Sequence, residues 1–115
     1  MQSVIMISER EVDFAQIEKH WKNKSISTNN LGLRLVIEVE KGRIYFDTIQ
    51  DGLPEYGDGE LTDLKMSNYN FYSISFTDSV VLKAFILETP FSSKIYIDDD
   101  NGEIMPYSEF CKLIE

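Results

Sequence analysis

The sequence has 115 residues, of which 43% are hydrophobic and 12% aromatic, and its formal net charge is −9. This length fits one domain, and this composition provides a hydrophobic core, so a two-domain chain and a disordered chain are both excluded. The single cysteine, Cys111, excludes an intramolecular disulfide and fits a reducing compartment. The first residues lack the features of a signal peptide, and no apolar run approaches a membrane span of about 20 residues. We therefore expect one soluble, cytoplasmic domain over residues 1–115.

The charge is divided unevenly along the chain. Residues 1–46 hold seven Lys and Arg against six Asp and Glu, whereas residues 47–115 hold four against 14. Nucleic-acid binding needs clustered positive charge facing phosphates, so the composition argues against it. The acidic second part favours a basic partner, although an acidic surface also serves solubility alone.

The first part of the chain predicts one strand and one helix. Residues 3–7 form a short apolar stretch that fits a strand. Asp13 is the expected helix N-cap, with Gln16 three residues later, and Val12 and Ile17 are spaced for a hydrophobic staple. The apolar residues at helical spacing are Phe14, Ile17 and Trp21. We expect this stripe to face the core.

Residues 33–49 predict a β-hairpin, which follows a polar loop over residues 25–30. Apolar and polar side chains alternate along its first strand, and Lys41-Gly42 fits a two-residue turn. This turn places Ile37 opposite Phe46 on an apolar face. The other face then carries three opposed pairs: Glu40 with Arg43, Glu38 with Tyr45, and Val36 with Asp47. A slip by one residue would mix the two faces.

Residues 50–63 predict a long acidic loop. Its glycines and proline interrupt regular structure, and its acidic residues are Asp51, Glu55, Asp58, Glu60 and Asp63. A loop of this length within a compact domain is either mobile or functional. We therefore include it, together with Tyr56, among the candidate contact residues.

Two apolar segments follow, residues 70–76 and residues 80–88. We interpret the first as a strand. The second is apolar on both faces, so its pattern fits a strand and also fits a buried helix capped by Asp78. Its short length and β-branched start favour the strand, and the helix is the alternative.

The last part of the chain predicts a hairpin and a short helix. Residues 94–98 and 103–105 flank Asp100-Asn101-Gly102, in which Asn-Gly suits a type I′ turn. Ser108 is the expected helix cap. The buried stripe of this helix is expected to be Phe110, Leu113 and Ile114. All the elements together predict an α+β fold, a mostly antiparallel β-sheet meander with an N-terminal helix and a short C-terminal helix.

No arrangement of reactive residues predicts catalysis. His20 is the single histidine and fits a boundary or surface position on the first helix, while Cys111 fits a small core residue. One histidine and one cysteine are too few for a transition-metal site. The segment from Asp98 to Glu109 has Glu103 where a calcium-binding loop needs glycine. We therefore expect no catalytic residue, no metal and no cofactor.

Tyrosine and acidic side chains mark the candidate contact surface. Tyrosine anchors contacts between proteins, and carboxylates attract basic partners. The same composition also occurs as ordinary decoration of a sheet. The expected partner-binding residues are Glu38, Tyr45, Asp47, Asp51, Glu55, Tyr56, Asp58, Glu60, Asp63, Asp98, Asp99 and Asp100.

The chain resembles the small acidic immunity proteins that accompany bacterial toxins, including those of contact-dependent growth inhibition systems. The resemblance covers its size, its charge, its single cysteine and histidine, and its α+β hairpin layout. It implies that the partner is a cognate toxin domain, often a basic nuclease. It also implies that inhibition comes from covering the active site or the substrate surface of that toxin.

Other functions fit the same sequence features. A small phage or mobile-element inhibitor would use acidic surface to mimic the charge of nucleic acid. A non-catalytic regulatory domain is a further alternative, and an enzyme is the least expected. An immunity gene directly follows its toxin gene, so gene neighbourhood separates the first function from the others.

Overall fold

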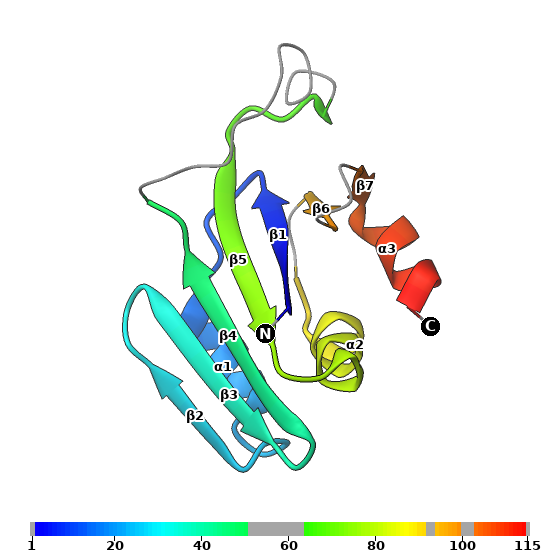
Figure 1. Cartoon of the computed structure of the whole chain (residues 1–115). Helices are drawn as coiled ribbons and strands as arrows, with labels where there is room; N and C mark the ends of the chain where they lie inside the picture. The colour runs from blue at the N-terminus through cyan, green and yellow to red at the C-terminus, as the bar shows by residue number, and fades with distance from the viewer. Residues whose placement is uncertain (1, 51–63, 92–93, 100–102, 115) are drawn as a thin grey trace.

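Seven strands and three helices make up the residues that the computed structural model describes, which are 2–50, 64–91, 94–99 and 103–114 (Figure 1). In chain order they are β1 (Gln2–Ser8), α1 (Phe14–Trp21), β2 (Ser27–Asn30), β3 (Arg34–Val39), β4 (Gly42–Thr48), β5 (Asn70–Phe76), α2 (Ser79–Glu88), β6 (Ile95–Asp98), β7 (Ile104–Pro106) and α3 (Tyr107–Ile114). The strands form one sheet in the order β2-β3-β4-β5-β1-β6-β7, with every neighbouring pair antiparallel. This arrangement confirms the predicted α+β class.

Strand β1 lies inside the sheet between two strands that come much later in the chain. It pairs with β5 from Gln2 opposite Phe76 to Ser8 opposite Asn70, and it pairs with β6 through Ile5 opposite Asp98. Strands β2 to β5 follow one another as a meander. The β6–β7 hairpin joins this meander only through β1, so β1 unites the two halves of the sheet.

Helix α1 begins at the predicted position. The carboxylate of Asp13 accepts a hydrogen bond from the backbone N–H of Ala15 at 3.0 Å, which caps the helix. The predicted stripe of Phe14, Ile17 and Trp21 is buried. The indole N–H of Trp21 donates to Thr89 Oγ1 at 2.9 Å, and this bond ties α1 to the segment that follows α2.

Strands β3 and β4 form the predicted hairpin, but their pairing is displaced by two residues, because the turn is Glu40–Lys41. The opposed pairs are Arg34 with Asp47, Leu35 with Phe46, Val36 with Tyr45, Ile37 with Ile44, Glu38 with Arg43, and Val39 with Gly42. A displacement by an even number of residues keeps each side chain on its predicted face. The predicted faces are therefore confirmed, and the predicted partners across the strands are wrong.

Gly42 lies outside the turn because of a contact with residues that are distant in the sequence. A Cβ atom at this position would overlap Thr77 Oγ1 and would lie 3.0 Å from Val81 Cγ2. The Thr77 hydroxyl oxygen also accepts a hydrogen bond from the backbone N–H of Arg43 at 3.0 Å. Glycine is therefore required by the close approach of β4 to the residues around the start of α2.

The polar segment before the hairpin is not only a loop. Ser27–Asn30 form the edge strand β2, which pairs with β3. The side chain of Asn30 accepts a hydrogen bond from the backbone N–H of Gly32 at 3.0 Å, and the positive φ of 90° at Gly32 turns the chain into β3. The prediction of a polar loop is wrong for these four residues, because hydrogen bonding to β3 prevails over their weak strand preference.

The preferred strand assignment for residues 80–88 is wrong, and the alternative helix is present as α2. Asp78 accepts a hydrogen bond from the backbone N–H of Val80 at 2.8 Å, as a helix N-cap does. The buried residues of α2 are Val81, Leu82, Phe85 and Ile86. Val80 and Leu87 are 51% and 41% exposed, so apolar residues lie on the outer side of α2 as well. This is why the segment lacks a one-sided helical pattern.

The C-terminal hairpin and helix are present, with one correction. Strands β6 and β7 pair through Ile97 opposite Met105, while the predicted turn over residues 100–102 lies outside the described residues. In α3, Phe110 is buried and Ile114 packs against the main core, but Leu113 is 69% exposed. The core lies on one side of α3 only, and Leu113 points to the other side.

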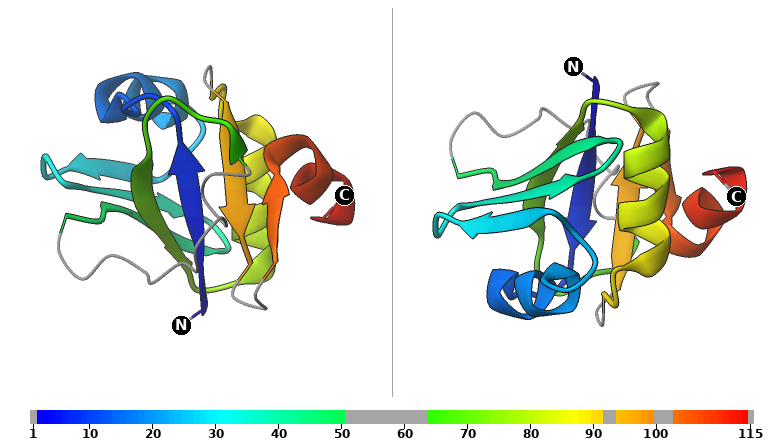
Figure 2. Two further views of the ribbon diagram at one scale, coloured as in Figure 1. Left: turned by 90° about the horizontal axis from the view of Figure 1, so that it is seen from above. Right: turned by 90° about the horizontal axis from the view of Figure 1, so that it is seen from below.

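All three helices cover one face of the sheet. Helix α1 packs against β2 and β3, α2 against β4 and β5, and α3 against β6 and β7. Figure 2 shows α1 on the β2 side of the molecule and α2 and α3 on the β7 side. On the opposite face, a smaller core of Ile7, Leu64 and Met66 covers β1 and β6.

Candidate functional site

Strands β2 to β5 carry polar and aromatic side chains on the face turned away from the helices. We call this surface the open face. In Figure 1 β3 and β4 lie in front of α1. The open-face residues, given by the strand register and the alternation along each strand, are Ser27, Asn29, Arg34, Val36, Glu38, Arg43, Tyr45, Asp47, Phe71, Ser73 and Ser75. All of them are half-buried or exposed.

An ion pair between β3 and β4 fixes Arg34. Its Nε lies 2.6 Å from Asp47 Oδ1 and its Nη2 lies 3.1 Å from Asp47 Oδ2, which is a two-point contact between directly opposed residues. This hydrogen bond, and next to it the charge of the carboxylate, raises the pKa of the Arg34 guanidinium above its ordinary value. Exposed pairs of this kind contribute at most about 1 kcal/mol to stability. The main consequence of the pair is therefore a fixed orientation of both side chains.

A second cross-strand pair joins Arg43 to Glu38. Arg43 Nε lies 3.3 Å from Glu38 Oε1, and the two residues are directly opposed. The pKa of Arg43 is raised, first by hydrogen bonding to Tyr45 and then by the charge of Glu38. Both predicted carboxylates of the open face therefore have an arginine of the same chain as their partner.

Tyr45 lies between these two pairs. The guanidinium carbon of Arg34 is 5.4 Å from the centre of its ring, which is within the range of a cation–π contact. Tyr45 is directly opposed to Val36 on β3 and to Ser75 on β5. An aromatic ring with ordered charged neighbours has already lost much of its side-chain freedom before any partner binds.

Asp98 shares a row of residues with Asp47. The register aligns Asp47 with Ser73, Ser73 with Ile5, and Ile5 with Asp98 across four neighbouring strands. At about 4.8 Å per strand, the two aspartates stand about 14 Å apart on the same side of the sheet. Asp99 lies beyond the end of β6, where its backbone N–H donates to Glu103 at 3.3 Å.

The structure therefore gathers part of the predicted contact set on one side of the sheet. Glu38, Tyr45 and Asp47 lie within the open face, and Asp98 lies along one of its rows. The other predicted contact residues, Asp51, Glu55, Tyr56, Asp58, Glu60, Asp63 and Asp100, lie outside the described residues.

Arg34 and Arg43 are the charged open-face residues that the predicted contact set omitted. Both lie on strands with the expected alternation of side chains, so the signal was present in the pattern. The register displaced by two residues gave Glu38 and Asp47 uncharged partners. Correct pairing of the hairpin would have revealed both ion pairs.

His20 and Cys111 do not join the open face. His20 is half-buried on α1, its ring lies 6.1 Å from that of Trp21, and its Nε2 has no hydrogen-bond partner among the described residues. Cys111 is half-buried on α3 and packs against the main core. Across residues 2–50, 64–91, 94–99 and 103–114, no group of three or more His, Cys, Asp or Glu is placed to hold a metal ion.

The chain was compared with known protein families, with curated proteins and with solved structures. No family model, no curated protein and no solved structure matches it. In the part of the chain that the structure describes, no helix is both long and apolar enough to cross a membrane. The site must therefore be interpreted from its own chemistry.

Proposed function

We propose that this chain is an acidic, cytoplasmic binding protein. It neutralises a cognate basic toxin domain, such as a nuclease, by forming a tight complex through the open face. The proposal includes no catalytic step and no cofactor. The class of partner, a bacterial toxin domain, comes from the resemblance of the chain to bacterial immunity proteins. The open face supplies the contact surface.

The ordered Arg34–Tyr45–Asp47 group is the observation that carries the proposal. Tyrosine and arginine are the residues that most often dominate the binding energy of protein interfaces. Here Asp47 holds Arg34 at 2.6 and 3.1 Å, and Arg34 lies over Tyr45. A partner that contacts this group orders few further side chains, so less of the gross interaction energy is lost as entropy.

The distribution of charge supports a basic partner. The described residues hold 13 acidic and 11 basic side chains and are nearly balanced, so most of the acidic excess belongs to the remaining residues. Five of those acids fall within residues 51–63. Excess negative charge on a chain accelerates its encounter with a basic protein, and contacts at the surface then determine how long the complex lasts.

The alternative of nucleic-acid mimicry has less support from the open face. A mimic of the phosphate backbone presents unpaired negative charges, whereas Glu38 and Asp47 each have an arginine partner. Mixed charges of both signs suit a specific protein surface better, because the pattern of signs selects one partner and rejects others. A non-catalytic regulatory domain would use the same face.

The test is co-expression of this gene with each of its neighbours on the native chromosome. We expect one neighbouring gene to encode a basic protein that copurifies with this chain and that stops growth when expressed alone. Growth should return when both are expressed. A copurifying protein that is harmless alone, or a toxic neighbour that this chain neither binds nor neutralises, would contradict the proposal.

A further inference from the structure

Strand β2 forms one edge of the sheet, and one of its sides has no neighbouring strand among the described residues. On its other side it pairs with β3, and Leu31 directly after it donates to the carbonyl of Arg34 at 2.7 Å. Hydrogen-bonded and non-hydrogen-bonded pairs alternate along antiparallel strands, so the N–H and C=O groups of Thr28 and Asn30 point away from β3. These backbone groups can pair with another strand.

The opposite edge of the sheet is less suited to pairing. Strand β7 has three residues and ends in Pro106, which has no N–H to donate, and α3 begins at the next residue. Strand β2 contains neither proline nor a charged side chain over Ser27–Asn30, although these are the features that usually keep an exposed edge from pairing. Strand β2 is therefore the edge that is open to a further strand.

Exposed apolar side chains flank both ends of β2. Ile26 precedes the strand and is 65% exposed, while Leu31 and Leu33 follow it and are 61% and 52% exposed. Single exposed apolar residues are common, but a group of them at one place on the surface marks contact with another protein. The edge therefore offers apolar side chains as well as backbone hydrogen-bonding groups.

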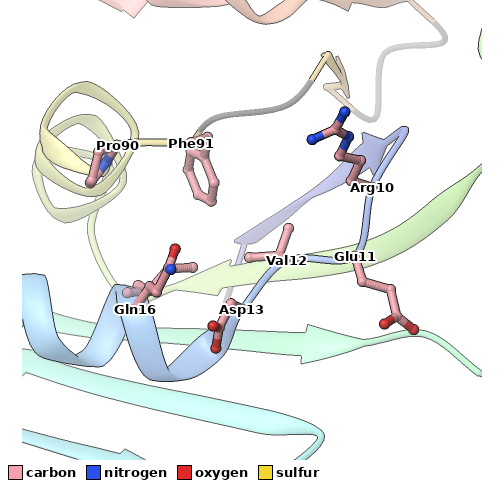
Figure 3. A pocket seen from close by; sticks show the side chains of 8 residues that line it. Arg10, Glu11, Val12, Asp13, Gln16, Pro90 and Phe91 are labelled. Carbon is pink, nitrogen blue, oxygen red and sulfur yellow. The ribbon is translucent and has the colours of Figure 1, made fainter.

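The charges beside β2 differ between its two ends. Lys22 and Lys24 precede the strand, are exposed, and have no ion pair to a described residue. Glu11 and Asp13 lie near the other end, because they line one pocket together with the β2–β3 connection. Figure 3 shows both carboxylates on the opposite side of the β1–α1 connection from the side chain of Arg10. The edge therefore has a basic end and an acidic end.

Antiparallel pairing of two copies through β2 brings the basic end of each copy to the acidic end of the other. A two-fold axis beside Asn29 pairs Thr28 of each copy with Asn30 of the other, and it brings Ile26 towards Leu31 of the other copy. Such an interface uses the same patch twice and must be self-complementary. Helix α1 packs on β2 and β3, so the two α1 helices come to about two strand spacings, or about 10 Å, which is usual for packed helices.

We infer that β2 pairs with β2 of a second copy of this chain, so that two chains form a dimer with one continuous sheet. Thr28 and Asn30 fix the register, and Lys24 meets Glu11 of the second copy. The acidic excess of the chain lies elsewhere, since residues 19–34 hold four basic and no acidic side chains. Both open faces lie on the same side of the continuous sheet and stay uncovered. The inference therefore goes beyond the proposed function and does not depend on it.

Sedimentation velocity of the full chain between about 1 µM and about 1 mM tests the inference. Pairing of two short strands buries little area, so we expect a reversible monomer–dimer equilibrium with a micromolar dissociation constant. Thr28→Pro removes an outward N–H and leaves the pairing with β3 in place, so it should weaken dimerisation at least about tenfold. Far-UV circular dichroism checks that this variant is folded. A chain that stays monomeric over the whole range would overturn the inference.

Charge variants identify the paired ends and do not depend on the proline substitution. Lys24→Glu and Glu11→Lys should each weaken self-association about three- to tenfold, because like charges then meet at both ends of the interface. An equimolar mixture of these two variants should form a heterodimer with about the parent affinity, since opposite charges meet again. The matched controls Lys83→Glu and Glu88→Lys change exposed residues of α2 and should alter the dissociation constant by less than about twofold.

Three results would place the contact elsewhere and overturn the inference. They are an unchanged dimer in folded Thr28→Pro, equal weakening by the variants on α2, and a mixture of Lys24→Glu with Glu11→Lys that associates no more tightly than either variant alone. None of these results would alter the co-expression test of the proposed function.

Discussion

Trp21 joins three parts of the fold through one side chain. It is 3% exposed, it stacks on Phe85 at 6.1 Å, and it donates a hydrogen bond to the buried Thr89. Trp21→Ala removes the ring and leaves Thr89 without its partner, so we expect a loss of about 3–5 kcal/mol in the free energy of unfolding. Urea unfolding monitored by far-UV circular dichroism measures this loss. A loss below about 1 kcal/mol would show that the ring is not part of the core.

Tyr107 makes the stability of the fold decrease at alkaline pH. Burial raises the pKa of its hydroxyl well above the ordinary value, and the hydroxyl donates to the carbonyl of Ile86 on α2. The folded state therefore holds this proton more tightly than the unfolded chain does. The contribution of the Tyr107 hydroxyl to the free energy of unfolding is complete below about pH 10 and is lost as the pH rises further.

The predicted result is a fall in the free energy of unfolding above about pH 10, by less than about 1.4 kcal/mol per pH unit because Tyr107 is only partly buried. Tyr107→Phe should reduce this slope, and Tyr69→Phe serves as a tyrosine control. Urea unfolding at several pH values between 8 and about 11 measures the slope. An unchanged slope in Tyr107→Phe would contradict the assignment.

The position of a single residue, as a cap or in the core, is predictable where the local spacing of residues determines it. The Asp13 cap and the stripe of Phe14, Ile17 and Trp21 follow from spacing alone, and all are confirmed. The predicted core position of Leu113 is wrong, because its spacing from Phe110 fits a helical stripe but the core reaches only one side of α3. Spacing identifies a face, and tertiary packing decides how wide that face is.

Helix α2 shows where a pattern over one element becomes ambiguous. Residues 80–88 are apolar on both sides, and this removes the periodicity by which a helix is distinguished from a strand. The signal that distinguishes the helix from the strand is Asp78 at the N-cap, and the β-branched residues, which favour a strand, are weaker evidence. A polar residue at the N-cap is specific to helices, because it satisfies N–H groups that a strand does not leave free.

The cap provides a prediction for this element. Asp78→Ala should lower the free energy of unfolding by about 1 kcal/mol, because the N–H of Val80 loses its acceptor. Asp78→Asn keeps an acceptor and should cost only a few tenths of that amount. Urea unfolding compares the two variants with the parent chain. Equal losses would indicate that the charge of Asp78, and not capping, supports α2.

The register of the β3–β4 hairpin and the presence of the edge strand β2 both depend on neighbouring elements. The faces of β3 and β4 were predictable, because a shift by two residues preserves them. The register depended on Gly42, which approaches Thr77 closely and so cannot be recognised from the hairpin alone. Strand β2 was missed because its polar residues form a strand only when β3 offers a partner.

At the scale of the whole molecule, the candidate site depends on long-range pairing. Glu38, Tyr45 and Asp47 are close in sequence, and their shared face was predictable. Asp98 joins their side of the sheet only because β1 pairs with both β5 and β6. The three pockets lined by Glu11 likewise combine five segments of the described chain, within residues 10–17, 30–33, 48–50, 69–72 and 90–91, and no local pattern indicates such a combination.

The excess charge of the chain gives a kinetic prediction. Replacing Asp51, Glu55, Asp58, Glu60 and Asp63 with Asn or Gln should slow association with the basic partner by about tenfold or more at low salt. The rate should also depend less on ionic strength, while the dissociation rate changes less. Stopped-flow association at several salt concentrations measures both effects.

A control variant separates local charge from total charge. It neutralises five acids of the described residues, namely Glu18, Asp78, Glu88, Glu103 and Glu109. Charges separated by more than about 8 Å are largely screened at physiological salt, so the position of the lost charges should matter. If both variants slow association equally, total charge alone steers the encounter and residues 51–63 have no special part.

The central claim is that the open face contacts the partner, and exchanging the Arg34–Asp47 pair tests it most directly. The double variant Arg34→Asp/Asp47→Arg keeps an ion pair between the strands, so the free energy of unfolding should change by less than about 1 kcal/mol. It reverses the charge pattern around Tyr45 without changing the net charge. The matched control, Lys83→Glu/Glu88→Lys, makes the same kind of exchange on the exposed side of α2.

The decisive measurement is the dissociation constant of each variant for the copurifying partner, determined by isothermal titration calorimetry. We expect the Arg34–Asp47 exchange to weaken binding by at least about 30-fold, as the loss of a central contact does. The exchange on α2 should leave the dissociation constant within about twofold of the parent value. Unchanged binding by the Arg34–Asp47 variant, with its fold intact, would contradict the claim that the open face is the contact surface.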